Sequence, residues 1–519
     1  MDPYDSLSYE SICFPETHPE SMAVLGRLMG LAAAEPSTCR VLELGCASGG
    51  NLIPMAEGLP GARLLGIDRS GSQAEAGNRL IEAVGFGNVR LIQGDILDLD
   101  PEPGAGLGQF DYIIAHGVYS WVPAQVQERL LLLGRGLLAP NGILYVSYNV
   151  LPGWRLRGAL RDILLDACWE ERDPRQRLVV ARGVLDRLAR GLADVPGAAA
   201  DLQREEIRRL RDAPGSYLYF EYLDEHHSPM LFRDFVRACE AAGLRYLCDT
   251  QLHTQFPATL GDSVEAALAD LEDGLEVEQW LDFLGNRAFR QSLLIRDDAE
   301  SEDLLSLERF AALSLCADLR PPARARPRDS RPVSFARPSG EGVEVCHPLT
   351  KGVLTALGDA FPDALPLGEV LPQAQGSVAQ LAGLATADDL SSLLAELFGL
   401  FARGAIQGRL HPRHLPRGLP ERPRVRPLVR ALVEEGRPQV PTRDHGNLDL
   451  DPLAARLIGL LDGTRTLGEL TGALPDPHRN SGDRGRGSSG GGRDAARQVQ
   501  GLLALFHRYG LLDPEGSGP

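Results

Sequence analysis

The sequence predicts an α/β protein: a doubly wound parallel sheet first, then a mainly helical α+β middle region and a helical C-terminal part. Short apolar segments alternate with segments of helical periodicity from about residue 40 to residue 148. Polar residues follow several of the apolar segments, and a glycine-rich turn follows the first of them. This alternation is typical of doubly wound sheets, whose ligands bind at the carboxyl ends of the strands.

The composition is that of a globular protein of roughly three domains, with 519 residues, 43% hydrophobic residues and a mean hydropathy of -0.14. A net charge of -18 disfavours nucleic acid as a partner, because such binding depends on cations that neutralise phosphates. The eight cysteines form no C-x-x-C pair, which favours a reducing compartment. We see no leader-like segment and no apolar run long enough to cross a bilayer, so we expect a cytoplasmic protein without membrane insertion.

Lys351 is the only lysine, so nearly every basic residue is an arginine. Two explanations stay open. A GC-rich genome favours arginine codons, which is the simpler explanation. Alternatively, an enzyme that modifies lysine avoids becoming its own substrate.

The elements of the sheet follow one another in regular order. Apolar strands are expected at residues 41–44, 62–68, 89–93, 110–115 and 143–148. Helices are expected between them, at residues 52–58, 72–84 and 123–138. A lead rich in proline and aromatic residues (4–19) precedes the first helix (21–31), and it forms either a lid over the site or a packed strap.

The turn at residues 45–51 is a candidate nucleotide site, because glycines let backbone N–H groups approach a ligand closely. Asp68 lies about 20 residues beyond the turn, where α/β nucleotide folds place a carboxylate for ribose hydroxyls. A dinucleotide oxidoreductase needs G-x-G-x-x-G, whereas here Ala47 stands between Gly45 and Gly49. Because alanine fits well only where φ is negative, we expect a slightly altered turn with negative φ at Ala47.

The order of Glu43 before the first glycine, then Asp68, then Asp95 resembles the class I S-adenosylmethionine-dependent methyltransferases over residues 38–150. The resemblance implies a Rossmann-like domain and S-adenosyl-L-methionine as cofactor. In that family the turn holds the methionine moiety, the next acid holds the ribose, and the third acid lies beside the adenine. The implied cofactor-binding residues are Glu43, Gly45, Ala47, Gly49, Asn51, Asp68, Arg69, Asp95, Ile96 and His116.

The methyl acceptor should lie at the ends of the fourth and fifth strands, where the methyl group would point. Aromatic faces tolerate a lysine cation, and a low-dielectric pocket lowers the amine pKa from about 10.4. His116 is a candidate base, although a packing role is the simpler interpretation, and His226-His227 lacks the partners of a zinc site, so no metal is expected. The candidate catalytic residues are Tyr119, Trp121, Tyr148, Asn149 and Trp154.

Several segments are similar to a bacterial family of methyltransferases with a regulatory middle domain, which includes protein-lysine methyltransferases that modify rickettsial outer-membrane protein. The resemblance implies the cofactor class and the order of domains, and it leaves the acceptor open. We expect the middle domain to form a wall of the substrate cleft, because its matching segments are aromatic. The matching segments are residues 14–19, 42–54, 148–154, 220–223 and 289–294.

The C-terminal part contains two copies of one pattern, at residues 347–406 and 451–512. Each copy has a helix, a polar turn, a helix beginning Leu-Gly-Glu, and a longer helix that ends at glycine before a short apolar strand. This winged-helix-like plan commonly binds peptides, nucleic acid or another copy of itself. The Pro/Arg stretch at residues 320–338 has little apolar content, and we expect an exposed linker there.

The expected domains are a cofactor-binding methyltransferase domain with an N-terminal lid (1–160), a regulatory or substrate-cleft domain (161–300), a helix with the linker (301–341), and two winged-helix-like modules (342–415 and 416–519). The second module contains a Gly/Ser/Arg-rich insertion (476–495) that we expect to be disordered. The predicted function is protein lysine N-methylation, with a protein or peptide as partner and an oligomeric state compatible with a dimer. Two alternatives stay open: a small-molecule methyltransferase of natural-product tailoring, and a cofactor-binding sensor or scaffold with vestigial activity.

Overall fold

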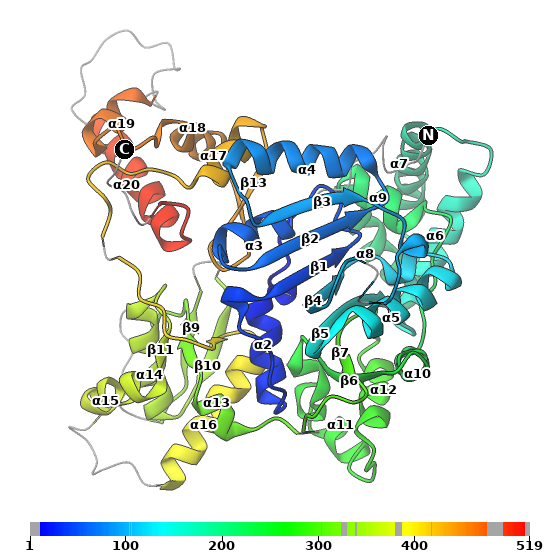
Figure 1. Cartoon of the computed structure of the whole chain (residues 1–519), viewed down its shortest axis with the longest axis horizontal. Helices are drawn as coiled ribbons and strands as arrows, with labels where there is room; N and C mark the ends of the chain where they lie inside the picture. The colour runs from blue at the N-terminus through cyan, green and yellow to red at the C-terminus, as the bar shows by residue number, and fades with distance from the viewer. Residues whose placement is uncertain are drawn as a thin grey trace.

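The computed structural model describes residues 11–513 except 103, 105, 303, 323–329, 338–339, 379–386, 417 and 475–490. Its centre is a seven-stranded sheet with the order β3-β2-β1-β4-β5-β7-β6 (Figure 1). Strands β1 to β5 are parallel, and β7 is antiparallel to both β5 and β6. The expected Rossmann-like sheet is therefore confirmed. The strands are β1 (Arg40–Leu44), β2 (Arg63–Asp68), β3 (Val89–Gln93), β4 (Phe110–Ala115), β5 (Leu138–Asn149), β6 (Leu244–Asp249) and β7 (Phe289–Arg296).

Helices cover both faces of this sheet. Successive side chains of a strand point to opposite faces, and in the central strands the side chains on both faces are apolar and need cover. In β4, Tyr112 and Ile114 belong to the core on one face, whereas Ile113 and Ala115 belong to the core on the other. The first face packs against α2 (Pro19–Leu28), α3 (Leu52–Gly58) and α4 (Gly71–Val84), and the second against α5 (Ala124–Leu137) and α10 (Phe232–Ala241).

The sheet does not end where the expected first domain ends, at residue 160. Strand β7 pairs with β5, and β6 pairs with β7, so the expected middle domain contributes two strands to the central sheet. The run Leu293-Leu294-Ile295 is buried throughout, which requires cover on both faces. Local sequence patterns do not reveal which strand such a segment will pair with. The domain boundaries themselves stay predictions.

The rest of the middle region is helical and lies beside the carboxyl end of β5. Its own apolar core contains Trp154, Leu164, Leu185, Ile207 and Tyr222. The helices are α6 (Gly153–Ala167), α7 (Pro174–Gly191), α8 (Ala198–Asp212), α9 (Gly215–Tyr222), α11 (Asp262–Ala267) and α12 (Gly274–Leu284). Two of these helices, α7 and α8, are rich in arginine.

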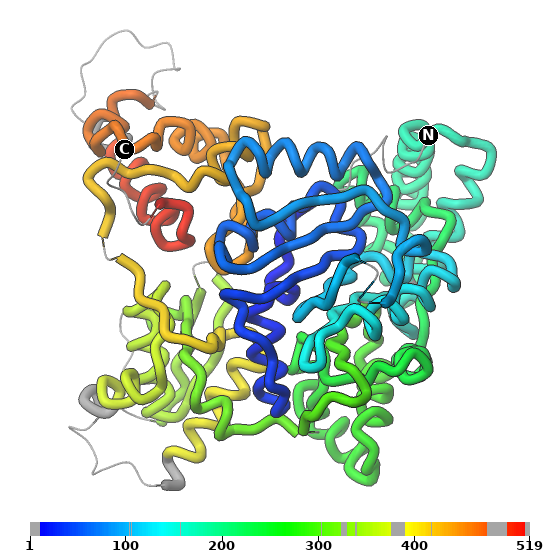
Figure 2. Tube along the Cα trace, viewed as in Figure 1, coloured from blue at the N-terminus to red at the C-terminus, as the bar shows by residue number. Residues whose placement is uncertain are grey.

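The two C-terminal copies share the expected order of helices, with α15 and α19 both beginning Leu-Gly-Glu. Helix α2 lies between the sheet and the first copy (Figure 1, Figure 2). From here on, each copy is taken together with the residues before it that fold with it. The first copy then comprises α13 (Leu307–Ala311), β8 (Ser314–Cys316), β9 (Val333–Ala336), β10 (Gly342–Val345), α14 (Pro348–Ala360), β11 (Leu365–Pro366), α15 (Leu367–Val378), α16 (Ala387–Ala402) and β12 (Gln407–Arg409). The second comprises α17 (Pro427–Glu434), β13 (Gln439–Pro441), β14 (Asn447–Asp449), α18 (Pro452–Leu460), α19 (Leu467–Ala473) and α20 (Gly491–Arg508).

Part of the stretch expected to be an exposed linker is instead folded. Strand β9 pairs with β10, and the Phe335 side chain is fully buried in the core of the first copy. Val333 and Phe335 alternate with other residues, so both side chains point to one face of the strand. The average composition of the whole stretch does not reveal this short apolar pattern. Of the expected insertion, residues 476–490 lie outside the described residues, and residues 491–495 begin α20. Among the described helices, none combines the length and the apolar character needed to cross a membrane.

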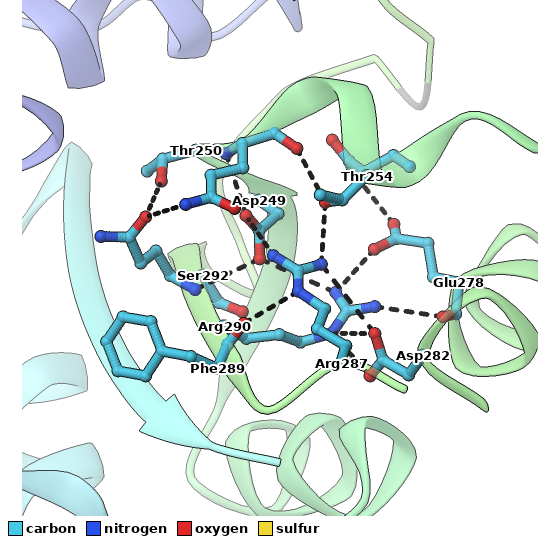
Figure 3. Close-up of polar contacts among 12 residues, drawn as sticks. Asp249, Thr250, Thr254, Glu278, Asp282, Arg287, Phe289, Arg290 and Ser292 are labelled. Atoms are coloured by element: carbon cyan, nitrogen blue, oxygen red, sulfur yellow. Dashed lines mark hydrogen bonds and ion pairs between the residues drawn. The ribbon is translucent and has the colours of Figure 1, made fainter. Parts of the chain in front are cut away.

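A buried ionic network joins β6, β7 and α12 behind the start of β7 (Figure 3). The fully buried Arg290 guanidinium donates to the Asp282 carboxylate (2.9 Å) and the Glu278 carboxylate (2.8 Å), and it lies 3.7 Å over the ring of Phe232. A second arginine, Arg287, forms an ion pair of 3.0 Å with the buried carboxylate of Asp249. These contacts hold the first residues of β7 against α12.

We expect Arg290→Met to lower the free energy of unfolding by about 3–5 kcal/mol, because it leaves buried carboxylates without their cation. Urea unfolding followed by tryptophan fluorescence measures the effect. The control is Arg296→Met on the same strand, whose partner Asp298 is exposed, and this variant should change stability little. Equal losses for the two variants would contradict a special role of the buried network.

Candidate active site

Strand β1 ends in a tight turn that leads into α3. The backbone φ is positive at Gly45, Ala47 and Gly49, with values of 75°, 48° and 76°. The expected negative φ at Ala47 is therefore wrong. A left-handed alanine costs roughly 1–2 kcal/mol, and the Ala47 N–H offsets this by donating a 2.7 Å hydrogen bond to the Asp68 carboxylate.

The carboxyl ends of β2 and β3 place two further acids on the same edge of the sheet. Besides Ala47, the Asp68 carboxylate accepts a hydrogen bond from the Ser70 N–H (2.8 Å). The Asp95 carboxylate accepts from the Leu97 N–H (2.9 Å). Since β1, β2 and β3 are neighbours in the sheet, these acids line one edge with the turn. The predicted residues Arg69 and Ile96 directly follow the two acids on this edge.

Asn51 links this turn to Glu43, and both side chains are buried. The Asn51 amide donates to Glu43 Oε1 (2.8 Å) and to the Thr17 hydroxyl (2.9 Å). Glu43 Oε2 is buried and has no hydrogen-bond partner among the described residues. Burial raises the pKa of Glu43 to about 8, despite the hydrogen bond from Asn51. A cationic donor beside Oε2 would therefore be stabilised strongly.

His116 follows β4 and lies in a layer of aromatic rings. Its ring is stacked on Phe14 at a centroid distance of 3.8 Å, and Phe289 meets it edge-on at 6.3 Å. Its Nδ1 is 2.9 Å from the Tyr145 hydroxyl. Burial lowers the pKa of His116 to about 4, so the imidazole is neutral at neutral pH.

A second aromatic cluster lies at the ends of β4 and β5. His227 stacks on Trp121 at 4.7 Å and lies 4.2 Å from the ring of Trp154, while its Nε2 is 3.1 Å from the Asn149 amide nitrogen. Burial lowers the pKa of His227 to about 3. Three of the predicted catalytic residues, Trp121, Asn149 and Trp154, are thus brought together. We call Trp121, Asn149, Trp154 and His227 the acceptor wall.

The other two predicted catalytic residues are not in this wall. Tyr148 stacks on Phe235 of α10 at 3.8 Å, and its hydroxyl is 3.0 Å from the Ser292 hydroxyl. Tyr119 meets Phe235 edge-on at 5.3 Å. Both tyrosines are almost completely buried in the core between the sheet and its helices, where no substrate can reach them. Adjacent strand residues point to opposite faces, so Asn149 faces the wall while Tyr148 faces the core.

Sequence reasoning missed Phe14, His227 and Phe289 as parts of the site. Each lies in or beside a segment that matches the family resemblance, which is the signal that identifies them. No periodicity places His227, because it lies in a loop that is attached by backbone hydrogen bonds. The Ser228 N–H donates to the Ser120 carbonyl (2.9 Å), and the Met230 N–H donates to the Asn149 carbonyl (3.2 Å).

Three family models match the chain: a methyltransferase domain (residues 42–144), a predicted methyltransferase regulatory domain (214–296) and the PKMT C-terminal winged helix domain (421–481). Two uncharacterized proteins of Rickettsia prowazekii, RP789 and RP028, are each 34% identical to this chain. The RP789 match covers 57% of this chain and 53% of that protein, and the RP028 match covers 47% and 96%. The chain thus spans about half of RP789 and nearly all of RP028.

Among solved structures, PKMT2 from Rickettsia typhi has a TM-score of 0.84 and is 25% identical, covering 97% of this chain and 100% of that chain. The chain belongs to one family with RP028, and its matched domains are those of a methyltransferase. A second PKMT2 structure, a complex with AdoHcy, has a TM-score of 0.85 and covers 97% of this chain and 99% of that chain. The resemblance to class I methyltransferases with a regulatory domain is therefore confirmed.

Two of the matched segments contribute different parts of the site. The methyltransferase domain contains the turn and the ends of β1 to β4. The regulatory domain supplies His227, β6 and β7, so it contributes directly to the edge that carries the acceptor wall. The expected role of this domain as a wall of the substrate cleft stays a prediction. The roles of the individual site residues stay predictions.

We expect Asp68→Ala to weaken AdoHcy binding by about 1–3 kcal/mol, because a carboxylate that holds ribose hydroxyls would be lost. Isothermal titration calorimetry measures the affinity. The control is Asp98→Ala, which removes an exposed carboxylate just after Asp95 and should leave binding unchanged. Unchanged affinity in Asp68→Ala would remove this residue from the cofactor site.

Proposed function

We propose that this chain transfers the methyl group of S-adenosyl-L-methionine to lysine side chains of a protein substrate. The similarity to PKMT2 over nearly the whole chain supports the reaction class, since PKMT denotes protein-lysine methyltransferase. The single observation that supports the acceptor is the aromatic wall at the ends of β4 and β5. It lies on the edge of the sheet that also carries the turn with Glu43.

The residues of the turn fit this cofactor. The turn residues with positive φ are Gly45, Ala47 and Gly49, and none of them has a side chain larger than a methyl group. The backbone of the turn can therefore approach a ligand closely. Glu43 Oε2, which has no partner among the described residues, suits the amino group of a methionine moiety. We assign Asp68 to the ribose and Asp95 to the adenine. When bound, the cofactor supplies an electrophilic methyl group on a positively charged sulfur.

The acceptor wall suits a lysine amine. The amine first loses a proton to solvent, then its nitrogen lone pair bonds to the methyl carbon while the carbon–sulfur bond breaks and its electron pair goes to sulfur. The face of Trp121, which is only partly buried, stabilises the cationic product by cation–π attraction, whereas the buried Trp154 supports the ring of His227. His116 and His227 are neutral because burial lowers the pKa of both, so neither repels this cation.

The enzyme itself offers no accessible lysine. The side chain of Lys351 is fully buried, and its Nζ donates to the backbone carbonyl of Arg331. An assay of lysine methylation therefore has no background from the single lysine of the folded enzyme. Label on lysine in such an assay therefore reports methylation of the added protein.

The decisive experiment incubates the enzyme with methyl-labelled S-adenosyl-L-methionine and a bacterial lysate. One lysate is native, and the matched lysate has its lysines acetylated, because an amide nitrogen is not a nucleophile. We expect label in protein bands of the native lysate and at least a tenfold loss of label in the acetylated one. Detection is by electrophoresis and autoradiography.

Three other outcomes would contradict the proposal. Label that persists in acetylated protein would indicate a different acceptor side chain. Label in the small-molecule fraction would favour natural-product tailoring. An absence of label, while calorimetry still detects AdoHcy binding, would favour a cofactor sensor.

The raised pKa of Glu43 makes a pH dependence testable. A cationic amino group favours the ionised carboxylate, so binding should release a proton from Glu43 below pH 8. We expect AdoHcy affinity to rise between pH 6 and pH 8, by at most tenfold per pH unit. In Glu43→Gln, this dependence should disappear. An identical pH profile in both proteins, measured by calorimetry, would exclude Glu43 as the titrating group.

A further inference from the structure

The segment of residues 11–18, here called the strap, crosses the carboxyl ends of β1 and β4. The Ser11 hydroxyl accepts a hydrogen bond from the Gly50 N–H (2.6 Å), and the Phe14 N–H donates to the side-chain Oδ1 of Asn51 (3.0 Å). At the other strand end, the Phe14 ring stacks on His116. Since β1 and β4 are neighbours in the sheet, the strap covers the edge between the turn and the aromatic layer.

The hairpin of β13 and β14, which lies more than 400 residues further along the chain, holds this strap. The Asn447 side-chain oxygen accepts from the Cys13 N–H (3.0 Å), and the Asn447 amide donates to the Cys13 carbonyl (2.9 Å). One side chain thus pairs with both backbone groups of a strap residue, as a neighbouring strand would do. These two bonds hold the strap from the hairpin side, in addition to its bonds with Gly50 and Asn51 of the turn.

The same hairpin also reaches the cofactor turn directly. His445 Nε2 is 2.8 Å from Asn51 Oδ1, and both side chains are buried. The His445 ring also lies 5.1 Å from that of His18 at the end of the strap. His445 adopts a φ of 58°, a left-handed conformation that turns its side chain inward from the tip of the hairpin. The turn is therefore contacted from outside by a residue of the second C-terminal copy.

The hairpin is itself firmly placed. The Asp444 carboxylate at its tip pairs with Arg409 and Arg413 from the end of the first copy. Arg426, just before α17, donates to the Pro441 carbonyl of β13 and pairs with Glu57 of α3, and Leu428 of α17 belongs to the core that covers one face of the sheet. Both C-terminal copies thus fix the hairpin against the methyltransferase domain.

We infer that the β13–β14 hairpin positions the cofactor site, with His445 and Asn447 as positioning residues for the turn and the strap. This inference rests on the proposed function, because it takes the turn as the cofactor site. The strap lies across that edge, so cofactor and product exchange when the strap moves away. The hairpin sets how long the strap stays in place. The second copy therefore acts on the affinity and exchange of the cofactor within the same chain.

The test compares Asn447→Ala with Asp449→Ala, two residues apart on β14, of which only Asn447 contacts the strap. We expect Asn447→Ala to weaken AdoHcy binding about tenfold, as the loss of two ordinary hydrogen bonds implies, mainly through faster dissociation. Asp449→Ala should bind as the wild type does. Calorimetry gives the affinity, and displacement of labelled AdoHcy gives the dissociation rate.

Two further measurements separate positioning from a general loss of stability. Hydrogen exchange in a peptide covering the strap should become faster in Asn447→Ala, while exchange in β4 and β5 stays unchanged. The KM for S-adenosyl-L-methionine should rise with little change in kcat. Asn447→Asp, which keeps the acceptor for the Cys13 N–H and loses the donor, should give an intermediate affinity.

The outcomes distinguish this inference from the proposed function. If wild-type protein binds no AdoHcy, the proposed function fails. If wild-type protein binds AdoHcy and Asn447→Ala binds it with equal affinity and dissociation rate, the positioning role is wrong. Faster exchange throughout the sheet in Asn447→Ala would also overturn it, because the hairpin would then stabilise the fold as a whole.

Discussion

The arrangement of the site depends on one buried amide. Asn51 is almost fully inaccessible to solvent, and a buried amide that lacks hydrogen-bond partners is costly. Its hydrogen-bond partners are Glu43 at the end of β1, Phe14 and Thr17 of the strap, and His445 of the hairpin in the second C-terminal copy. Three segments far apart in the sequence must therefore meet at the cofactor turn for this one side chain to be satisfied.

Local patterns predict the parts of the fold that depend on local chemistry. The positions of β1 to β5 follow from apolar periodicity, and Glu43, Asp68 and Asp95 reach one edge because parallel strands end together. Local patterns do not predict that β6 and β7 belong to the sheet, since β7 pairs with β5 more than 100 residues earlier in the chain and β6 joins the sheet through β7. The conformation of Ala47 was also missed, because the hydrogen bond to Asp68 that offsets its strain is a tertiary contact.

The acceptor wall shows the same division between local and tertiary information. Trp121, Asn149 and Trp154 were predicted because they follow strands whose ends were already located. Tyr148 was chosen by the same reasoning, but one position along a strand reverses the face, and its ring belongs to the core. His227 was missed, since its loop is placed by backbone hydrogen bonds to residues after β4 and at the end of β5. Such bonds do not depend on side-chain identity, so no sequence pattern predicts them.

The strength of the contacts indicates which of them can open. Apolar packing of Leu428 and the ion pair of Arg426 with Glu57 attach the second copy to the methyltransferase domain, and these groups lie in or against the core. The contacts between hairpin and strap are few neutral hydrogen bonds, each worth about 0.5–1.5 kcal/mol. Motion that releases the strap therefore costs far less than motion that detaches the copy. A winged-helix plan suggests a module that binds a partner, and here the second copy binds the methyltransferase domain of the same chain. Its attachment to that domain is stable, whereas its hydrogen bonds to the strap are weak enough to open for cofactor exchange.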